Sequence, residues 1–138
     1  TKIIRWRGDP RDSCISMFCT QFPAGVPYSY DLYKLGAFYS QYERTMEHWH
    51  QTLPDDMMIE IEYEELIQNQ AAESRRLLDF LELEWHDDCI TFYKQKRVVH
   101  TASDTQVTKP LYSTSIGRWK HYQKHLQPLE DGFKYQKD

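Results

Sequence analysis

The chain has 138 residues, of which 40% are apolar, 14% aromatic and 28% charged, with a formal net charge of −4. This length supports one domain with a hydrophobic core, and the composition excludes a disordered, collagen-like or linker sequence. Apolar runs are far shorter than the roughly 20 residues that cross a bilayer, and the net charge argues against nucleic acid as a general partner. The three cysteines have no metal-like spacing, which argues against a disulfide framework and fits a cytoplasmic, reducing compartment.

Charge is distributed in blocks along the chain. Residues 1–42 carry a net charge of +2, residues 43–93 of −11 and residues 94–124 of +6. Two interpretations stay open. The acidic block is a solvated surface without further meaning, or the two basic blocks converge on an anionic ligand while the acidic block faces solvent.

The first predicted elements are a strand over residues 2–7 and a helix from Pro10 to about Phe22. Gly8 ends the strand, Asp9 is a favourable N-cap residue, and proline suits the first helical position. We expect one apolar face on this helix to be buried, formed by Ile15, Phe18, Cys19 and Phe22.

A longer second helix is predicted from its cap at Asp31 to Leu53, where Pro54 follows. Its apolar residues repeat at steps of three and four, which indicates one buried stripe. The stripe consists of Leu32, Leu35, Tyr39, Tyr42, Met46, Trp49 and Leu53.

The middle of the chain predicts a second strand over residues 57–61, a helix over 71–81 and a short helix over 85–96. Residues 98–112 lose the helical period and are expected to form a loop. A last helix is expected to be capped within residues 113–115 and to end before Pro128.

Strands that alternate with helices predict an α/β fold with a parallel sheet. Only two strands are visible, and two strands do not make a stable open sheet. We therefore expect further strands upstream in a longer protein, or a sheet completed by another chain.

Two segments are candidates for binding an anion. The junction from strand to helix at Asp9 is flanked by Arg7 and Arg11, with the Ser16 hydroxyl nearby, and a helix N-terminus presents free N–H groups. An ordinary capped helix explains this junction equally well. The second candidate is the loop over residues 101–112, a possible ligand lid, followed by a basic helix start at residues 117–120.

No metal site or enzyme triad is expected. His48 and His50 lie on different faces of a helix, and His86 with Cys89 lacks two further ligands. The acidic residues of 60–65 are interpreted as a solvated edge. Neither a nucleophile elbow nor a Walker-type glycine loop occurs in the sequence.

Three segments resemble sulfotransferases that use 3′-phosphoadenosine 5′-phosphosulfate, in particular bacterial enzymes often fused to tetratricopeptide repeats and protein-tyrosine sulfotransferases. They are IIRWRGDPRDSCIS at residues 3–16, residues 42–54 with EYEEL at 62–66, and residues 101–119, which contain TAS, QV, KP and GRW. The resemblance covers nearly the whole chain, in the family's order.

This resemblance implies that residues 1–138 are the C-terminal part of one P-loop-type, parallel-sheet domain. It also implies transfer of a sulfuryl group from the nucleotide co-substrate to an unknown acceptor that bears a hydroxyl or amine, without a metal. The family's glycine-rich loop and general base would lie in an upstream section, so we expect this chain alone to be inactive.

The resemblance also assigns roles to residues. Ser16 would bind the 3′-phosphate, Tyr63 would lie beside the nucleotide, and Ser103 would be catalytic by donating to the sulfuryl group. Where the family usually has an arginine, this chain has Gly8, and Arg7 and Arg11 are the nearest replacements. The expected nucleotide-binding residues are Arg7, Arg11, Ser16, Tyr63, Ser103, Gln106, Val107, Lys109, Pro110 and Arg118.

Two other functions remain open at this point. One is a non-catalytic nucleotide-binding or protein-interaction domain that retains the fold. The other is a different P-loop-type phosphotransferase, which would need the same upstream loop.

Overall fold

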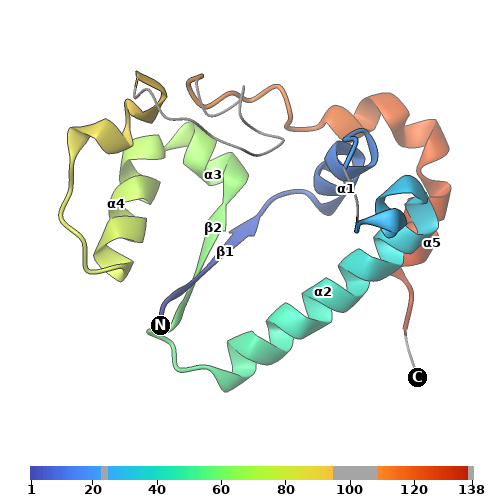
Figure 1. The fold of residues 1–138 in the computed structure, drawn as a ribbon, viewed down its shortest axis with the longest axis horizontal. Helices are drawn as coiled ribbons and strands as arrows, with labels where there is room; N and C mark the ends of the chain where they lie inside the picture. Colours follow the sequence, from blue (N-terminus) through green and yellow to red (C-terminus); the bar gives the residue numbers. More distant parts are fainter. Residues whose placement is uncertain (23–24, 95–108, 137–138) are drawn as a thin grey trace. The chain divides into compact units, whose positions relative to one another are not determined.

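The computed structural model describes residues 1–22, 25–94 and 109–136. The chain divides into two compact units. The strand unit comprises residues 1–7 and 56–113, and the helical unit comprises residues 8–55 and 114–138. Figure 1 shows their elements in chain order. Among the described residues, no helix combines the length and apolar character that a membrane crossing requires.

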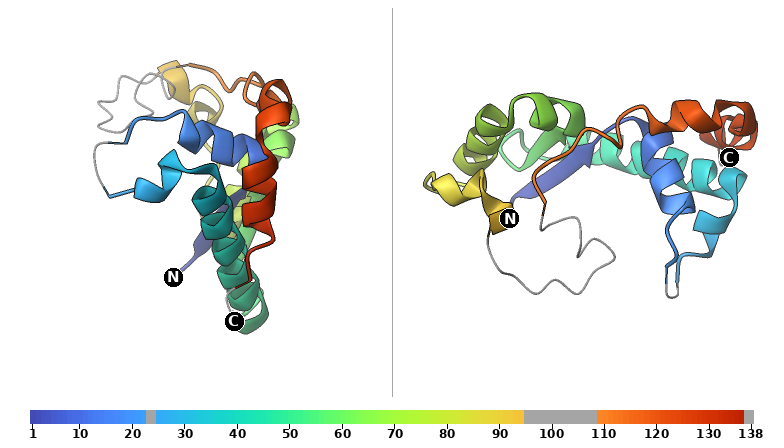
Figure 2. Two further views of the ribbon diagram at one scale, coloured as in Figure 1. Left: turned by 90° about the vertical axis from the view of Figure 1, so that its right-hand side faces the viewer. Right: turned by 90° about the horizontal axis from the view of Figure 1, so that it is seen from above.

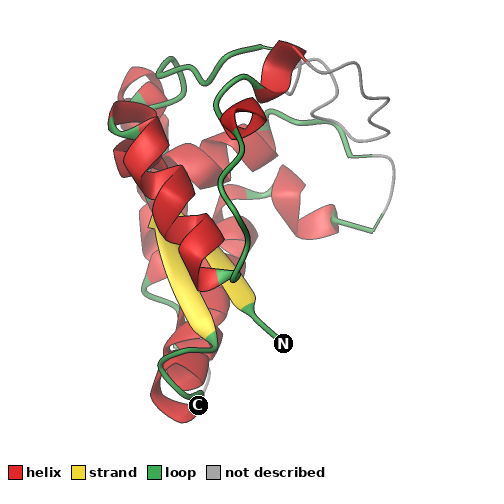
Figure 3. Ribbon diagram, turned by 90° about the vertical axis from the view of Figure 1, so that its left-hand side faces the viewer, coloured by secondary structure: helices red, strands yellow, loops and turns green. Residues whose placement is uncertain are grey.

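The strand unit is built on a two-stranded parallel sheet, as the sequence predicted. Strands β1 (Ile3–Arg7) and β2 (Met58–Glu62) pair in register from Ile3 with Met58 to Arg7 with Glu62. Figure 3 shows the two strands side by side in yellow. On β1 only Arg5 is buried, whereas both neighbours on the strand, Ile4 and Trp6, are exposed. On β2 the buried residue is Ile61, which pairs with Trp6, so each face of the sheet has one buried side chain.

In the described part of the strand unit, four short helical elements follow β2. They are α3 (Tyr63–Gln68), α4 (Gln70–Phe80) and the 3-10 helices η2 (Asp87–Cys89) and η3 (Phe92–Lys94). The single helix expected over residues 85–96 is wrong for its described part, which forms two 3-10 turns. Local side-chain bonds favour a turn there, because Asp87 accepts from the Trp85 indole and His86 accepts from the Asp88 N–H.

The helical unit contains α1 (Pro10–Phe18), the 3-10 helix η1 (Pro27–Tyr30), α2 (Leu32–Thr52), the 3-10 helix η4 (Arg118–His125) and α5 (Gln127–Phe133). Its core brings together residues from both ends of the chain. The buried apolar side chains are Cys14, Ile15, Leu35, Leu126 and Leu129. The face expected for the first helix is therefore partly wrong: Ile15 is buried, but Phe18 and Cys19 are exposed and the helix ends at Phe18.

Helices α2 and α5 pack very closely, and Figure 2 shows α5 alongside α2. Gly36 and Gly132 lie at the crossing, where a side chain on either would overlap backbone of the facing helix. The helix expected from residue 117 ends before Pro128, as predicted, but it is not the last one, because α5 follows it. Proline lies in the first turn of α5, where its missing N–H costs nothing, and it begins a helix.

The N-caps predicted for α1 and α2 are confirmed, whereas those predicted for η4 are wrong. Asp9 and Asp31 cap α1 and α2 as expected, each accepting a hydrogen bond from a backbone N–H. Ser113 to Ser115 do not cap η4, which begins after Gly117 in a left-handed conformation with φ of 72°. Such a φ suits glycine, which has no Cβ to clash.

Candidate functional site

At the start of helix α1, the Asp9 carboxylate binds both the backbone and the side chain of Arg11. The Asp9 carboxylate accepts from the Arg11 backbone N–H at 2.9 Å, and from the guanidinium Nε and Nη2 at 2.9 and 2.6 Å. Partial burial works to raise the pKa of Asp9, but the hydrogen bonds from Arg11 outweigh it and lower the pKa. Asp9 therefore both caps the helix and fixes the Arg11 side chain.

The Arg11 guanidinium also stacks on the indole ring of Trp119, 3.6 Å from the ring centroid. This is a close cation–π contact between α1 and η4. Arg11 thus already has a carboxylate and an aromatic partner. Its expected role as a replacement for the arginine missing at position 8 stays a prediction.

Asp12 joins the start of α1 to the start of η4. Its two carboxylate oxygens accept from the backbone N–H groups of Gly117 at 2.6 Å and Trp119 at 2.7 Å. More than a hundred residues separate these partners in the sequence. The start of α1 and the start of η4 therefore meet within the helical unit.

This contact changes the interpretation of the η4 start as an anion site. Two of its N–H groups, which would otherwise face an anion, are bound by Asp12. Recognition of a phosphate at this place would fall to side chains. Arg118, between these two N–H groups, forms no ion pair among the residues that the structure describes, and it is half-buried.

Ser16 lies one helical turn after Asp12, on the same side of α1, and is exposed. Within the described ranges its hydroxyl has no hydrogen-bond partner; only its carbonyl is used, by the Thr20 hydroxyl at 2.7 Å. Because Asp12 binds the N–H groups on both sides of Arg118, the start of η4 lies against α1 one helical turn from Ser16. The other residues expected to bind the nucleotide, apart from Arg11, belong to the strand unit or lie outside the described residues.

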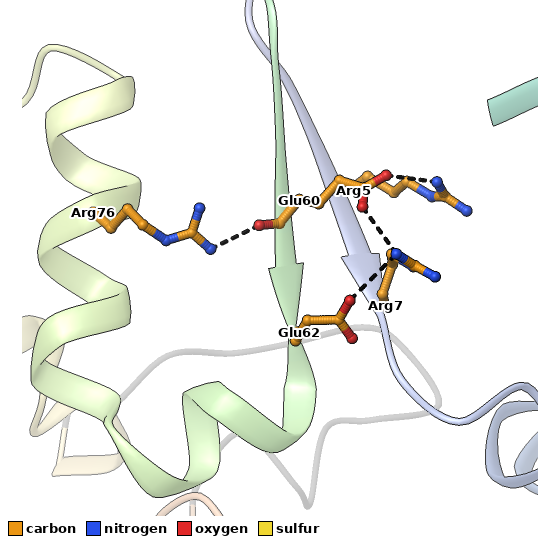
Figure 4. A network of polar contacts seen from close by, with 5 residues as sticks. All are labelled: Arg5, Arg7, Glu60, Glu62 and Arg76. Carbon is orange, nitrogen blue, oxygen red and sulfur yellow. Dashed lines mark hydrogen bonds and ion pairs between the residues drawn. The ribbon is translucent and has the colours of Figure 1, made fainter. Parts of the chain in front are cut away.

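Arg7 lies in the strand unit within a network of ion pairs (Figure 4). Its guanidinium contacts Glu60 at 3.1 Å and Glu62 at 3.4 Å, and the hydrogen bond that it donates to Glu60 raises its pKa. Glu60 also binds the buried Arg5 at 2.6 Å. Burial works to raise the pKa of Glu60, but the bonds from Arg5 and Arg7 outweigh it and lower the pKa. The interpretation of Glu60 as part of a solvated edge is wrong.

Tyr63, the first residue of α3, contacts the last residue of the segment expected to form a loop. Its hydroxyl donates to the Tyr112 carbonyl at 2.9 Å, and burial raises its pKa. Lys109 and Pro110 precede Tyr112 and are exposed. The strand unit therefore brings Tyr63 next to the end of this segment. Ser103, Gln106 and Val107 lie outside the described residues, so their expected roles stay predictions.

Sequence reasoning missed Asp12 and Trp119 as joining residues. In the sequence Asp12 is only an acid three residues after the cap, and nothing in its local pattern indicates a partner beyond residue 110. The one signal is the segment GRW, which lies in the resemblance without an assigned role for its glycine or tryptophan. Among the described residues, no group of three metal-ligating side chains comes together.

Comparison with known proteins adds two findings. A family model described as "Sulfotransferase family" matches residues 1–87. The chain is also 34% identical over 144 residues to a protein of Aquifex aeolicus (strain VF5) named "Uncharacterized protein". That alignment covers 99% of this chain and 19% of the relative, so the chain spans about a fifth of the relative's length.

Proposed function

The chain belongs to the sulfotransferase family, and from this premise we propose that it binds 3′-phosphoadenosine 5′-phosphosulfate and takes part in sulfuryl transfer to a hydroxyl or amine acceptor. In this proposal the helical unit supplies the contacts to the 3′-phosphate. Ser16 donates its hydroxyl and Arg118 contributes its positive charge. In the same proposal, the chain is the C-terminal part of a P-loop-type domain. The other catalytic residues would lie elsewhere in this part and in the segment that precedes it in members of the family.

The observation that carries the proposal is the junction of α1 and η4. Asp12 binds the N–H groups on both sides of Arg118, and Ser16 lies one turn further along the same side of α1. Among the described residues the Ser16 hydroxyl has no hydrogen-bond partner and the Arg118 guanidinium has no ion pair, and such a pair suits a phosphate because charge-assisted hydrogen bonds are the strong ones. Sulfuryl transfer itself depends largely on positioned donors and cations, which this arrangement supplies.

Ser103 remains the proposed catalytic residue. A hydroxyl donor at the sulfuryl group would stabilise charge that develops on its oxygens, so its removal would lower turnover more than nucleotide affinity. Tyr63, Gln106, Val107, Lys109 and Pro110 are proposed to contact the same nucleotide on the basis of the family resemblance. The bond from Tyr63 to Tyr112 supports a shared role for α3 and the end of this segment.

Calorimetric titration with adenosine 3′,5′-bisphosphate, the expected product, tests the proposal. Replacing Ser16 by Ala should weaken binding by about tenfold, the loss expected for one hydrogen bond to a charged group. Thr45→Ala is the matched control, because Thr45 is exposed on α2 and its hydroxyl binds only the preceding turn. Equal affinity of both variants and the parent protein would exclude Ser16 from the site.

A further inference from the structure

We propose that Asp12 is a positioning residue for the nucleotide site: its carboxylate holds the first turn of η4 so that Arg118 faces the ligand of Ser16. This inference rests on the proposed function and assigns a role to a residue that no ligand is expected to touch. Asp12 is on α1, and it acts on Arg118 through the backbone on either side of that residue.

The Asp12 carboxylate binds the η4 backbone on both sides of residue 118. One oxygen accepts from the Gly117 N–H at 2.6 Å and the other from the Trp119 N–H at 2.7 Å. Gly117 has a positive φ and no side chain with which to cap the helix. The cap of η4 is thus supplied from a distant helix, and the direction in which Arg118 leaves the backbone depends on it.

A neighbouring contact between side chains fixes the same turn. The Trp119 ring lies against the Arg11 guanidinium, and that guanidinium is held by Asp9. Residue 119 is therefore fixed to α1 by its backbone and by its side chain. Because Gly117 and Trp119 are both fixed, the backbone of Arg118 keeps a defined position. Its own side chain has no ion-pair partner among the described residues.

The charge of Asp12 is compatible with a phosphate nearby because it is bound by these donors. An unpaired carboxylate beside a phosphate would repel it. Here the two N–H groups of η4 that donate to Asp12 partly offset its negative charge. Asp12 and Ser16 share one side of α1, so the residue that positions the cation and the residue that donates the hydroxyl are one turn apart. Loss of the carboxylate would release the η4 turn and weaken the Arg118 contact without removing any ligand contact.

The test is a double-mutant cycle measured by titration with adenosine 3′,5′-bisphosphate. Arg118→Ala and Asp12→Asn should each weaken binding by about tenfold, because Asn offers one acceptor oxygen in place of two. The double variant should bind no more weakly than Arg118→Ala alone, since Asp12 acts through Arg118. Both single variants should also flatten the dependence of affinity on salt, as expected for a lost charge contact.

Asp31→Asn is the matched control, because Asp31 caps α2 in the same unit and its carboxylate binds the Lys34 N–H. It should leave affinity and its salt dependence unchanged at a temperature where circular dichroism shows all variants folded. If Asp12→Asn does not fold, Asp12→Glu, whose extra methylene displaces both acceptor oxygens from the η4 N–H groups, replaces it in the same cycle. An affinity loss that adds in full to that of Arg118→Ala would overturn the positioning role.

The two proposals fail in different ways. If the parent protein does not bind the nucleotide, or Ser16→Ala and Arg118→Ala leave its affinity unchanged, the proposed function is wrong. If those two variants weaken binding while Asp12→Asn behaves as Asp31→Asn does, the proposed function stands and the role of Asp12 is wrong.

Discussion

At the scale of single residues, the main feature is that charged side chains already have partners inside each unit. Asp9 holds Arg11, Asp12 holds the η4 backbone, and Glu60 binds Arg5 and Arg7. The cations expected to replace the family's arginine are among those occupied. Placing an arginine at position 8 measures directly how much nucleotide affinity is lost by having glycine there.

Gly8→Arg should tighten binding of adenosine 3′,5′-bisphosphate. Gly8 does not have a positive φ, so an arginine side chain is compatible with its backbone. A new charge-assisted hydrogen bond contributes about 1.5–3 kcal/mol, less where water screens it, so we expect an affinity gain of about tenfold by titration. Gly8→Ala separates the charge from the backbone effect and should leave the affinity unchanged. A Gly8→Arg variant that binds no better than Gly8→Ala would show that Arg7 or Arg11 fills this role.

At the scale of elements, an ion pair with a buried guanidinium joins the side chains of β1 and β2. Arg5 has a side-chain exposure of 6% and its guanidinium lies 2.6 Å from Glu60. Removing one partner of such a pair costs more stability than replacing both by apolar residues, because it leaves the other charge buried. The network around it is shown in Figure 4.

Glu60→Gln should lower the free energy of unfolding by about 2 kcal/mol at neutral pH, measured by urea denaturation. The pKa of Glu60 is lowered in the fold, so its ion pair stabilises the protein at neutral pH and this contribution is lost as the pH falls through the lowered value. The difference between Glu60→Gln and the parent protein should therefore shrink in acid. Glu62→Gln, which removes a more exposed contact to Arg7, should cost less than about 1 kcal/mol. Equal losses of unfolding free energy for both variants would show that burial of Arg5 does not strengthen its ion pair with Glu60.

The crossing of α2 and α5 gives a second prediction at this scale. A Cβ at Gly36 would overlap the Leu129 carbonyl oxygen, which is backbone and cannot move aside easily. Gly36→Ala should therefore destabilise the protein by about 1–3 kcal/mol, although helix propensity alone would favour alanine by about 1 kcal/mol. Gln41→Ala, at an exposed position on the same helix, is the control for thermal unfolding. An increase in stability for Gly36→Ala would mean that the helices are further apart.

Local chemistry explains which elements could be predicted from the sequence. The two strands and the caps at Asp9 and Asp31 depend on neighbouring residues, and the structure confirms them. A helix does end before Pro128 as predicted, but that Pro128 also begins α5 was not predicted, because proline suits the first turn of a helix as well as the position after one. The cap of η4 could not be predicted, since its donor groups and the Asp12 carboxylate are distant in sequence.

At the scale of the whole molecule, family membership supports the proposed reaction class, and the helical unit holds the testable part of the proposed site. Sequence alone pointed to Ser16 and Arg118 through the resemblance. The reason we propose for their sharing a site, the Asp12 bridge from α1 to η4, required the fold. The contribution of the strand unit depends on Tyr63 and on the segment that ends at Tyr112.

Recognition of a 3′-phosphate is the property on which the proposed function depends. The most direct measurement is the protein's affinity for adenosine 3′,5′-bisphosphate compared with adenosine 5′-monophosphate, which lacks only that group. We predict at least about tenfold tighter binding of the bisphosphate, because the lost phosphate would leave the Ser16 and Arg118 contacts unmade. Equal affinity for the two nucleotides would contradict this recognition.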